Sequence, residues 1–121
     1  MESVLVCVTV KKECERLILA GRRFAEAECL PLHVLHVMEE KDQSGFDAAA
    51  QEVLNHLYAL SRDAGAEMTV LRAQDVNAAI ADYAKKIGAV CVIVGSDSRG
   101  EWAVAEDLRE QLDNSITVMR A

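Results

Sequence analysis

Apolar and polar positions follow two alternating patterns along the chain. Short, mostly apolar runs are typical of strands, and the longer segments between them repeat apolar residues every three or four positions, as amphipathic helices do. The short runs predict strands at residues 4–10, 32–38, 67–72, 90–94 and 115–119. The helical spacing predicts helices at residues 13–29, 46–64, 76–87 and 101–112. This alternation indicates an α/β fold, a parallel sheet with helices on both faces.

Differences in apolar content between these strands predict their order in the sheet. The first and fourth strands are continuously apolar, as expected of central strands that are buried on both faces. The third and fifth alternate apolar and polar residues, as half-exposed strands at the two edges do. The order 3-2-1-4-5 satisfies both observations. Because no interdomain linker interrupts the pattern, we expect residues 1–121 to form a single domain.

Charge and composition exclude several classes of function. The 20 acidic and 13 basic residues give a formal charge of −7, whereas nonspecific binding to nucleic acid requires a basic face. No apolar run is long enough for membrane insertion, and the first residues lack the basic segment of a signal peptide, so we expect a cytoplasmic protein. The four cysteines form neither a C-x-x-C pair nor a zinc-binding spacing, so no metal site is expected.

The predicted strand order places a candidate ligand site where the first and fourth strands end. Open α/β sheets bind ligands in the crevice at this switch point. The residues that we expect there follow the two strands: Val8, Thr9, Val10, Gly95, Ser96, Ser98 and Arg99. Small residues let backbone N–H groups reach an anion, and an arginine can pair with a phosphate. The alternative is a solvated turn, because Asp97 and Glu101 would oppose a bound phosphate.

No catalytic constellation accompanies this crevice. The chain contains no G-x-G-x-x-G after the first strand, no P-loop and no recognisable serine, histidine and aspartate spacing. His33 and His36 lie three residues apart on one strand, so their side chains point to opposite faces and cannot share a metal ion. A weak nucleotide hydrolase would have only Asp97 and Glu101 as acidic groups near the loop. We therefore expect a protein that is not an enzyme, with the weak hydrolase as the open alternative.

The order and spacing of several segments resemble the universal stress protein family, most closely the variant found in KdpD-type sensor kinases. The segments that carry this resemblance span nearly the whole chain: Val4-Leu5-Val6-Cys7-Val8, Leu35-His36-Val37, Asp75-Val76-Asn77-Ala78-Ala79-Ile80 and Val94-Gly95-Ser96. The resemblance implies a Rossmann-like three-layer α/β/α fold with a five-stranded parallel sheet in the order 3-2-1-4-5. It also implies a homodimer joined through the last strand, residues 115–119, which begins at Ser115 and ends at Met119.

Two departures from the family pattern concern the nucleotide loop. ATP-binding members of the family carry an aspartate after the first strand and a loop of the form G-x2-G-x9-G-[S/T] around the phosphates. In this chain Thr9 stands at the position of the aspartate, Ser98 replaces the second glycine, and the final glycine-serine pair is missing. A shortened loop loses backbone donors for a triphosphate, so tight ATP binding is not expected.

The resemblance still implies a place for a smaller nucleotide. An adenine would rest against Val8, Thr9, Val37 and Met38, with Ser96, Ser98 and Arg99 at the phosphate. The tripeptide Ser96-Asp97-Ser98 is similar to a Ser-x-Ser element that associates some KdpD-type domains with a cyclic dinucleotide.

The leading hypothesis is a non-enzymatic, cytoplasmic regulatory domain with a degenerate nucleotide-binding loop, acting as a homodimer in stress or signalling. The alternative is a KdpD-like sensor module that binds ATP, AMP or a cyclic dinucleotide. Neither hypothesis requires a cofactor, a metal ion, a nucleic-acid partner or membrane insertion.

Overall fold

Eight helices and strands alternate along the described part of the chain. The computed structural model describes residues 2–8, 15–39, 48–94, 112 and 115–120. In chain order the elements are β1 (Ser3–Cys7), α1 (Glu15–Glu28), β2 (Leu32–Glu39), α2 (Ala48–Asp63), β3 (Glu67–Ala73), α3 (Val76–Lys86), β4 (Ala89–Val94) and β5 (Thr117–Arg120).

The five strands form one parallel sheet in the order β3-β2-β1-β4-β5. The central strand β1 pairs with β2 on one side and β4 on the other, so that Val4 lies opposite both Leu32 and Cys91. The strands β3 and β5 lie at the two edges. Both the predicted strand order and the Rossmann-like α/β class are confirmed.

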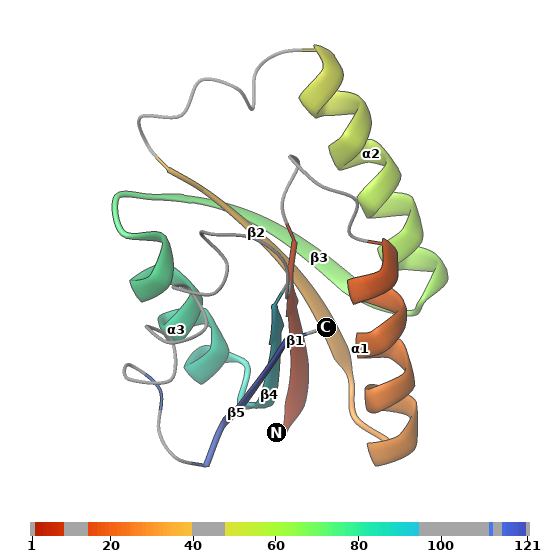
Figure 1. The fold of residues 1–121 in the computed structure, drawn as a ribbon, viewed down its shortest axis with the longest axis vertical. Coiled ribbons are helices and arrows are strands. Elements are labelled where there is room, and N and C mark those ends of the chain that lie inside the picture. Colours follow the sequence, from red (N-terminus) through yellow and green to blue (C-terminus); the bar gives the residue numbers. More distant parts are fainter. Residues whose placement is uncertain (1, 9–14, 40–47, 95–111, 113–114, 121) are drawn as a thin grey trace.

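Helices cover both faces of the sheet, as Figure 1 shows, with α1 and α2 on one side and α3 on the other. Each face has its own buried apolar cluster. The cluster beneath α1 and α2 contains Val6, Val34 and Leu57, and the cluster beneath α3 contains Leu5 and Val92. The continuously apolar strands β1 and β4 supply residues to both clusters, which explains their central place in the sheet.

Glycine at position 21 allows α1 to lie close to the sheet. Gly21 is buried on the inner face of α1, and a Cβ atom at this position would collide with the side chain of Val6 in β1. Leu32 would lie 3.1 Å from the same added atom. Protein interiors are closely packed, so the helix would have to move outward to accept any larger residue here.

The predicted ends of two helices are confirmed by their glycines. Gly65 follows α2 with a φ of 74°, and Gly88 follows α3 with a φ of 66°, a left-handed conformation in which glycine carries no steric cost. At the other end of α3, the side chain of Asp75 accepts a hydrogen bond of 3.1 Å from the backbone N–H of Ala78. This contact caps the helix and fixes where it begins.

Several predicted boundaries need correction. Strand β1 ends at Cys7, so Val8 is not part of a strand, and Thr9 and Val10 lie outside the described residues. The last strand begins at Thr117 and not at Ser115, because Ser115 and Ile116 lie in a turn and a bend. Of the helix expected at residues 101–112, the structure describes only the last residue, Leu112, which is buried but not helical.

One aromatic residue of α2 does not pack in the core. An isolated tyrosine in an amphipathic helix is expected in the core or at its edge, yet the side chain of Tyr58 is 56% exposed on the outer side of α2. The neighbouring Leu57 is 2% exposed and fills the inward position instead. Consecutive residues of a helix point about 100° apart, and the apolar spacing through Val53, Leu57 and Leu60 directs Leu57 inward, so Tyr58 faces away from the sheet.

Candidate functional site

The candidate site lies at the edge of the sheet where its parallel strands end. Of the residues predicted there, the structure describes Val8, Val37 and Met38. The others, Thr9, Val10, Gly95, Ser96, Ser98 and Arg99, lie outside the described residues. The strand order brings the ends of β1 and β4 side by side, so the expected switch point is present between them.

The three described residues are divided between the two faces of the sheet. Val8 is 6% exposed and belongs to the cluster beneath α1 and α2. Val37 is partly buried and packs against the cluster beneath α3. Met38 follows Val37 in β2 and is also partly buried, and the alternation of side chains along a strand directs it to the face of Val34 and His36. The accessible apolar surface among these three residues therefore comes from Val37 and Met38 of β2, one on each face of the sheet, and not from the buried Val8.

A histidine from β2 binds the backbone at the end of β1. The N–H of Val8 donates a hydrogen bond of 2.9 Å to the carbonyl oxygen of Leu35. The carbonyl oxygen of Val8 lies 3.0 Å from Nδ1 of His36. Because a carbonyl oxygen only accepts, Nδ1 carries the proton and donates it. These two hydrogen bonds satisfy both the N–H and the carbonyl group of Val8.

Sequence analysis placed His36 on the opposite face from His33, and the structure confirms this. The ring of His33 packs edge-on against Tyr83 of α3, with 6.4 Å between the ring centroids. His36 lies on the other face and is 6% exposed. The hydrogen bond to Val8 was not predicted, because the two residues are 28 positions apart and their pairing depends on the sheet register.

The thiols of Cys7 and Cys91, on the central strands, are expected to be unreactive near pH 7. Burial raises the pKa of the Cys7 thiol to about 12 and that of Cys91 to about 11. Both thiols are therefore neutral near pH 7, and a neutral thiol is a poor nucleophile and a poor metal ligand. Among the residues that the structure describes, no three histidine, cysteine, aspartate or glutamate side chains come together as metal ligands.

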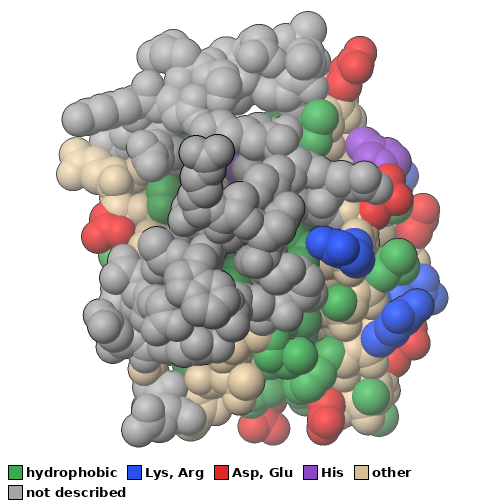
Figure 2. All heavy atoms as spheres, viewed as in Figure 1, with side chains coloured by type: hydrophobic (Ala, Val, Ile, Leu, Met, Phe, Trp, Pro, Cys, Tyr) green, Lys and Arg blue, Asp and Glu red, His purple; other side chains and the backbone are tan. Residues whose placement is uncertain are grey.

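The described surface carries charges of both signs along α1 and α2. Figure 2 shows acidic and basic side chains interspersed along this margin of the molecule. Arg22 and Glu26 form an ion pair on α1, with 2.9 Å between Nε and Oε1. A second contact joins α1 to α2, where Nε2 of His56 lies 2.7 Å from Oε1 of Glu15.

In the described residues, no helix has the length and apolar character needed to cross a membrane.

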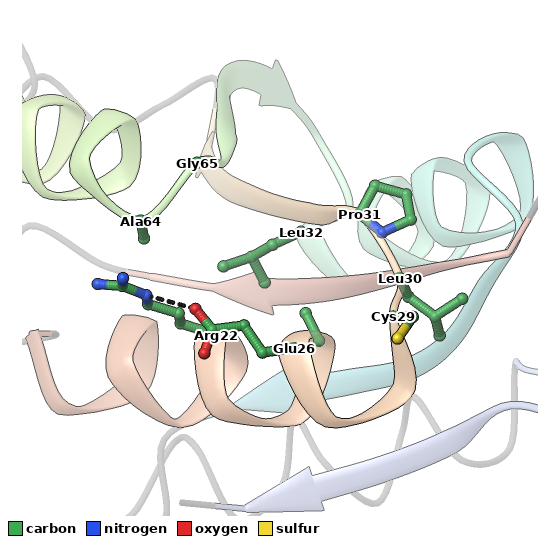
Figure 3. A pocket seen from close by; sticks show the side chains of 9 residues that line it. Arg22, Glu26, Cys29, Leu30, Pro31, Leu32, Ala64 and Gly65 are labelled. Carbon is green, nitrogen blue, oxygen red and sulfur yellow. Dashed lines mark hydrogen bonds and ion pairs between the residues drawn. The ribbon is translucent and has the colours of Figure 1, made fainter.

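A hollow of about 180 Å³ lies at the opposite edge of the sheet. It is bordered by the end of α1, the turn into β2 and the turn after α2, as Figure 3 shows. The residues that line it are Arg22, Ala25, Glu26, Cys29, Leu30, Pro31, Leu32, Ala64 and Gly65. These residues lie where β2 and β3 begin, whereas a nucleotide is expected where the strands end. The hollow is therefore remote from the edge where nucleotides are expected. It is separate from the candidate site.

Comparisons with known proteins connect this arrangement to one family. A model of the universal stress protein family matches residues 1–105. The sensor protein KdpD of Mycobacterium tuberculosis, in strains H37Rv and CDC 1551, is 31% identical over 102 residues. That match covers 84% of this chain but only 12% of the length of the relative.

Solved structures show the same fold. The universal stress protein from Archaeoglobus fulgidus, solved alone and in complex with dAMP, matches with a TM-score of 0.74 and 21% identity over 99% of this chain. The match covers 98% of that chain in the first structure and 97% in the complex. A universal stress protein in complex with cAMP matches with a TM-score of 0.69 and 14% identity, covering 98% of this chain and 96% of that one.

Proposed function

The chain belongs to the universal stress protein family, and from this premise we propose that it is a non-enzymatic regulatory domain that works as a homodimer in the cytoplasm. Its role is to sense or transmit a signal in stress, through a nucleotide site reduced from the ATP-binding form. The observation that carries this proposal is the strand order, because it brings the ends of β1 and β4 together at the switch point of the sheet.

The ligand that we propose is an adenine nucleotide smaller than ATP. Two structural relatives were solved with dAMP and with cAMP, which supports a mononucleotide. In this chain Thr9 stands where ATP-binding members have an aspartate, and the loop after Val94 lacks the final glycine-serine pair. Val37 and Met38 offer partly exposed apolar surface for a base beside the buried Val8, and Arg99 is the proposed partner of the phosphate.

A thermal-shift series tests the ligand. A ligand that binds only the folded state adds stability of RT ln(1 + [L]/Kd), which is about 2.7 kcal/mol at a hundred times Kd. We expect AMP and cAMP to raise Tm at millimolar concentration, ATP to raise it less, and Arg99→Ala to remove the shift. Lys85→Ala, in the last turn of α3, is the matched loss of a positive charge and should keep it. If no nucleotide moves Tm, the proposed ligand is wrong.

The second candidate function is a KdpD-like sensor module, which the identity to the sensor protein KdpD favours. Its ligand would be a cyclic dinucleotide bound near Ser96-Asp97-Ser98. A cyclic dinucleotide in the same thermal series distinguishes the two candidates, because the larger stabilisation identifies the preferred ligand. The weak hydrolase is tested separately: magnesium-dependent release of phosphate from ATP by the purified protein would contradict the non-enzymatic assignment.

A further inference from the structure

His36 is a polar residue in a position where an apolar one would ordinarily pack. It lies in β2 beside Val34 and Leu35, and only 6% of its surface is exposed. Within the described residues, its one side-chain hydrogen bond joins Nδ1 to the carbonyl oxygen of Val8 at 3.0 Å. A buried polar side chain is costly unless it is hydrogen-bonded, so this bond stabilises His36 in its buried position.

The hydrogen bond lies where the pairing of β1 with β2 stops. The register runs from Val4 opposite Leu32 to Cys7 opposite Leu35, and the N–H of Val8 still donates to the carbonyl of Leu35. In a continuing parallel ladder, the carbonyl of Val8 would next accept from the backbone N–H of Val37. The ring of His36 occupies this acceptor instead.

Beyond that point β2 continues with a different neighbour. Its pairing with β3 extends to Glu39 opposite Ala73, whereas its register with β1 ends at Leu35. The described part of this segment ends at Val8, and the side chain of His36 binds its carbonyl. This is also the edge at which we propose that the nucleotide base rests.

The tautomer of His36 follows from its partner. Since Nδ1 donates to a carbonyl, the neutral ring leaves Nε2 without a proton and able only to accept. Nε2 is buried, and no donor among the described residues reaches it.

We propose that His36 is a positioning residue for the nucleotide site: its Nδ1–H bond to the carbonyl of Val8 fixes the end of β1 against β2, beside Val37 and Met38, the partly exposed apolar residues on which the base rests. The residue acts through Val8 and touches no ligand. The inference about binding rests on the proposed function, but the inference about the end of β1 is tested without any nucleotide.

Three variants separate this role from simple packing. In His36→Asn the side-chain N–H can occupy nearly the place of Nδ1–H, whereas in His36→Gln the amide lies one bond further out. His36→Leu removes the donor but keeps apolar volume. His33→Leu is the matched control, because it removes a histidine from the same strand on the opposite face, where the ring packs on Tyr83.

The first experiment needs no ligand. Nitrogen NMR of the neutral wild-type imidazole should show the proton on Nδ1 and not on Nε2. Hydrogen exchange of the Val8 amide should accelerate about tenfold in His36→Leu and His36→Gln, consistent with loss of one buried hydrogen bond. His36→Asn and His33→Leu should leave it within about threefold of wild type. Exchange in β3 and α3 reports global stability and corrects for any general loss.

The second experiment measures the affinity for AMP by calorimetry. We expect His36→Leu and His36→Gln to weaken binding about tenfold and His36→Asn to restore it. Should wild type fail to bind AMP while the Val8 exchange follows the expected order, the proposed ligand is wrong and the role of His36 at the end of β1 stands. A proton on Nε2 instead of Nδ1, or equal Val8 exchange in His36→Asn and His36→Gln, overturns the positioning role. If His36→Leu does not fold, the comparison of the two amide variants still decides the matter.

Discussion

The hydroxyl of Ser3 donates a hydrogen bond of 2.8 Å to the carbonyl oxygen of Ile87, joining residues 84 positions apart. Ser3 begins β1 and is 1% exposed, and Ile87 ends α3 just before β4. The backbone N–H of Ser3 also donates to the carbonyl of Gly88 at 3.1 Å. One residue therefore binds both carbonyls of the turn that leads into the neighbouring central strand.

Removal of this hydroxyl should destabilise the protein. Ser3→Ala leaves the Ile87 carbonyl without its side-chain donor, and we expect a loss of about 1–2 kcal/mol in the free energy of unfolding, measured in urea. Ser61→Ala is the matched control, because its hydroxyl donates to Leu57 within the same helix at 2.7 Å. A local bond of that kind contributes little to tertiary structure, so equal losses in both variants would contradict the prediction.

The contact between α1 and β1 predicts that Gly21→Ala is destabilising. The added methyl group meets the side chain of Val6, and overpacking of this kind costs about 1–3 kcal/mol. Val6→Ala creates the missing space, so the double variant should lose less than the sum of the two single losses. A double-mutant cycle in urea measures this coupling, and additive losses would show that the two positions do not contact each other.

Thiol reactivity should follow burial. Cys29 is exposed after α1, whereas Cys91 is buried in β4 and burial raises the pKa of Cys7 to about 12. In a Cys14→Ser background, which removes a residue outside the described range, we expect iodoacetamide at pH 7.5 to label Cys29 and to spare the other two. Mass spectrometry of the digested protein identifies the labelled sites. Rapid labelling of Cys91 in the folded state would contradict its buried position.

The raised pKa of Cys91 predicts a loss of stability at alkaline pH. Burial raises this pKa from 9.0 to about 11, so between these values the unfolded chain releases a proton that the folded chain retains. The thiol's contribution is complete below pH 9 and falls as the pH rises to 11, by at most about 1.4 kcal/mol per pH unit. Urea unfolding of Cys91→Ala should show a flatter decline from pH 9 to 10.5. The exposed Cys29→Ala should keep the wild-type slope, and three parallel slopes would count against the shift.

The proposed homodimer predicts a role for Met119. Met119 lies in the edge strand β5 and is 38% exposed, and Val118 beside it is buried beneath α3. A second copy that pairs along β5 would cover Met119, so Met119→Lys should shift the protein to monomer in light scattering at micromolar concentration. Val70→Lys changes an exposed apolar residue in the other edge strand, β3, and should leave the dimer intact. A wild-type monomer at all concentrations would rule out the dimer.

Much of the fold could be predicted because burial leaves a local pattern. The continuous apolar runs at β1 and β4 indicate strands covered on both faces, and Gly65 and Gly88 mark helix ends where a left-handed backbone is needed. Tyr58 shows the limit of inferring burial from residue type alone, since this aromatic side chain is exposed while that of the neighbouring Leu57 is buried. The site was predicted only as an edge of the sheet with a set of loop residues, most of which lie outside the described part of the chain.

The amino-acid sequence by itself determined the α/β class and the order of the strands, because both depend on which residues must be removed from water. It also determined the family, through the similarity of its segments to those of other members. Tertiary structure alone decided that His36 binds Val8 and that Ser3 binds Ile87. Hydrogen bonds reach only about 3 Å, so their partners depend on strand register, and a slip of one residue would separate both pairs. Hydrophobic burial tolerates such a shift in position far better than a directional bond does. The order of apolar and polar residues along the chain therefore predicts which segments are buried, but not which atoms form hydrogen bonds.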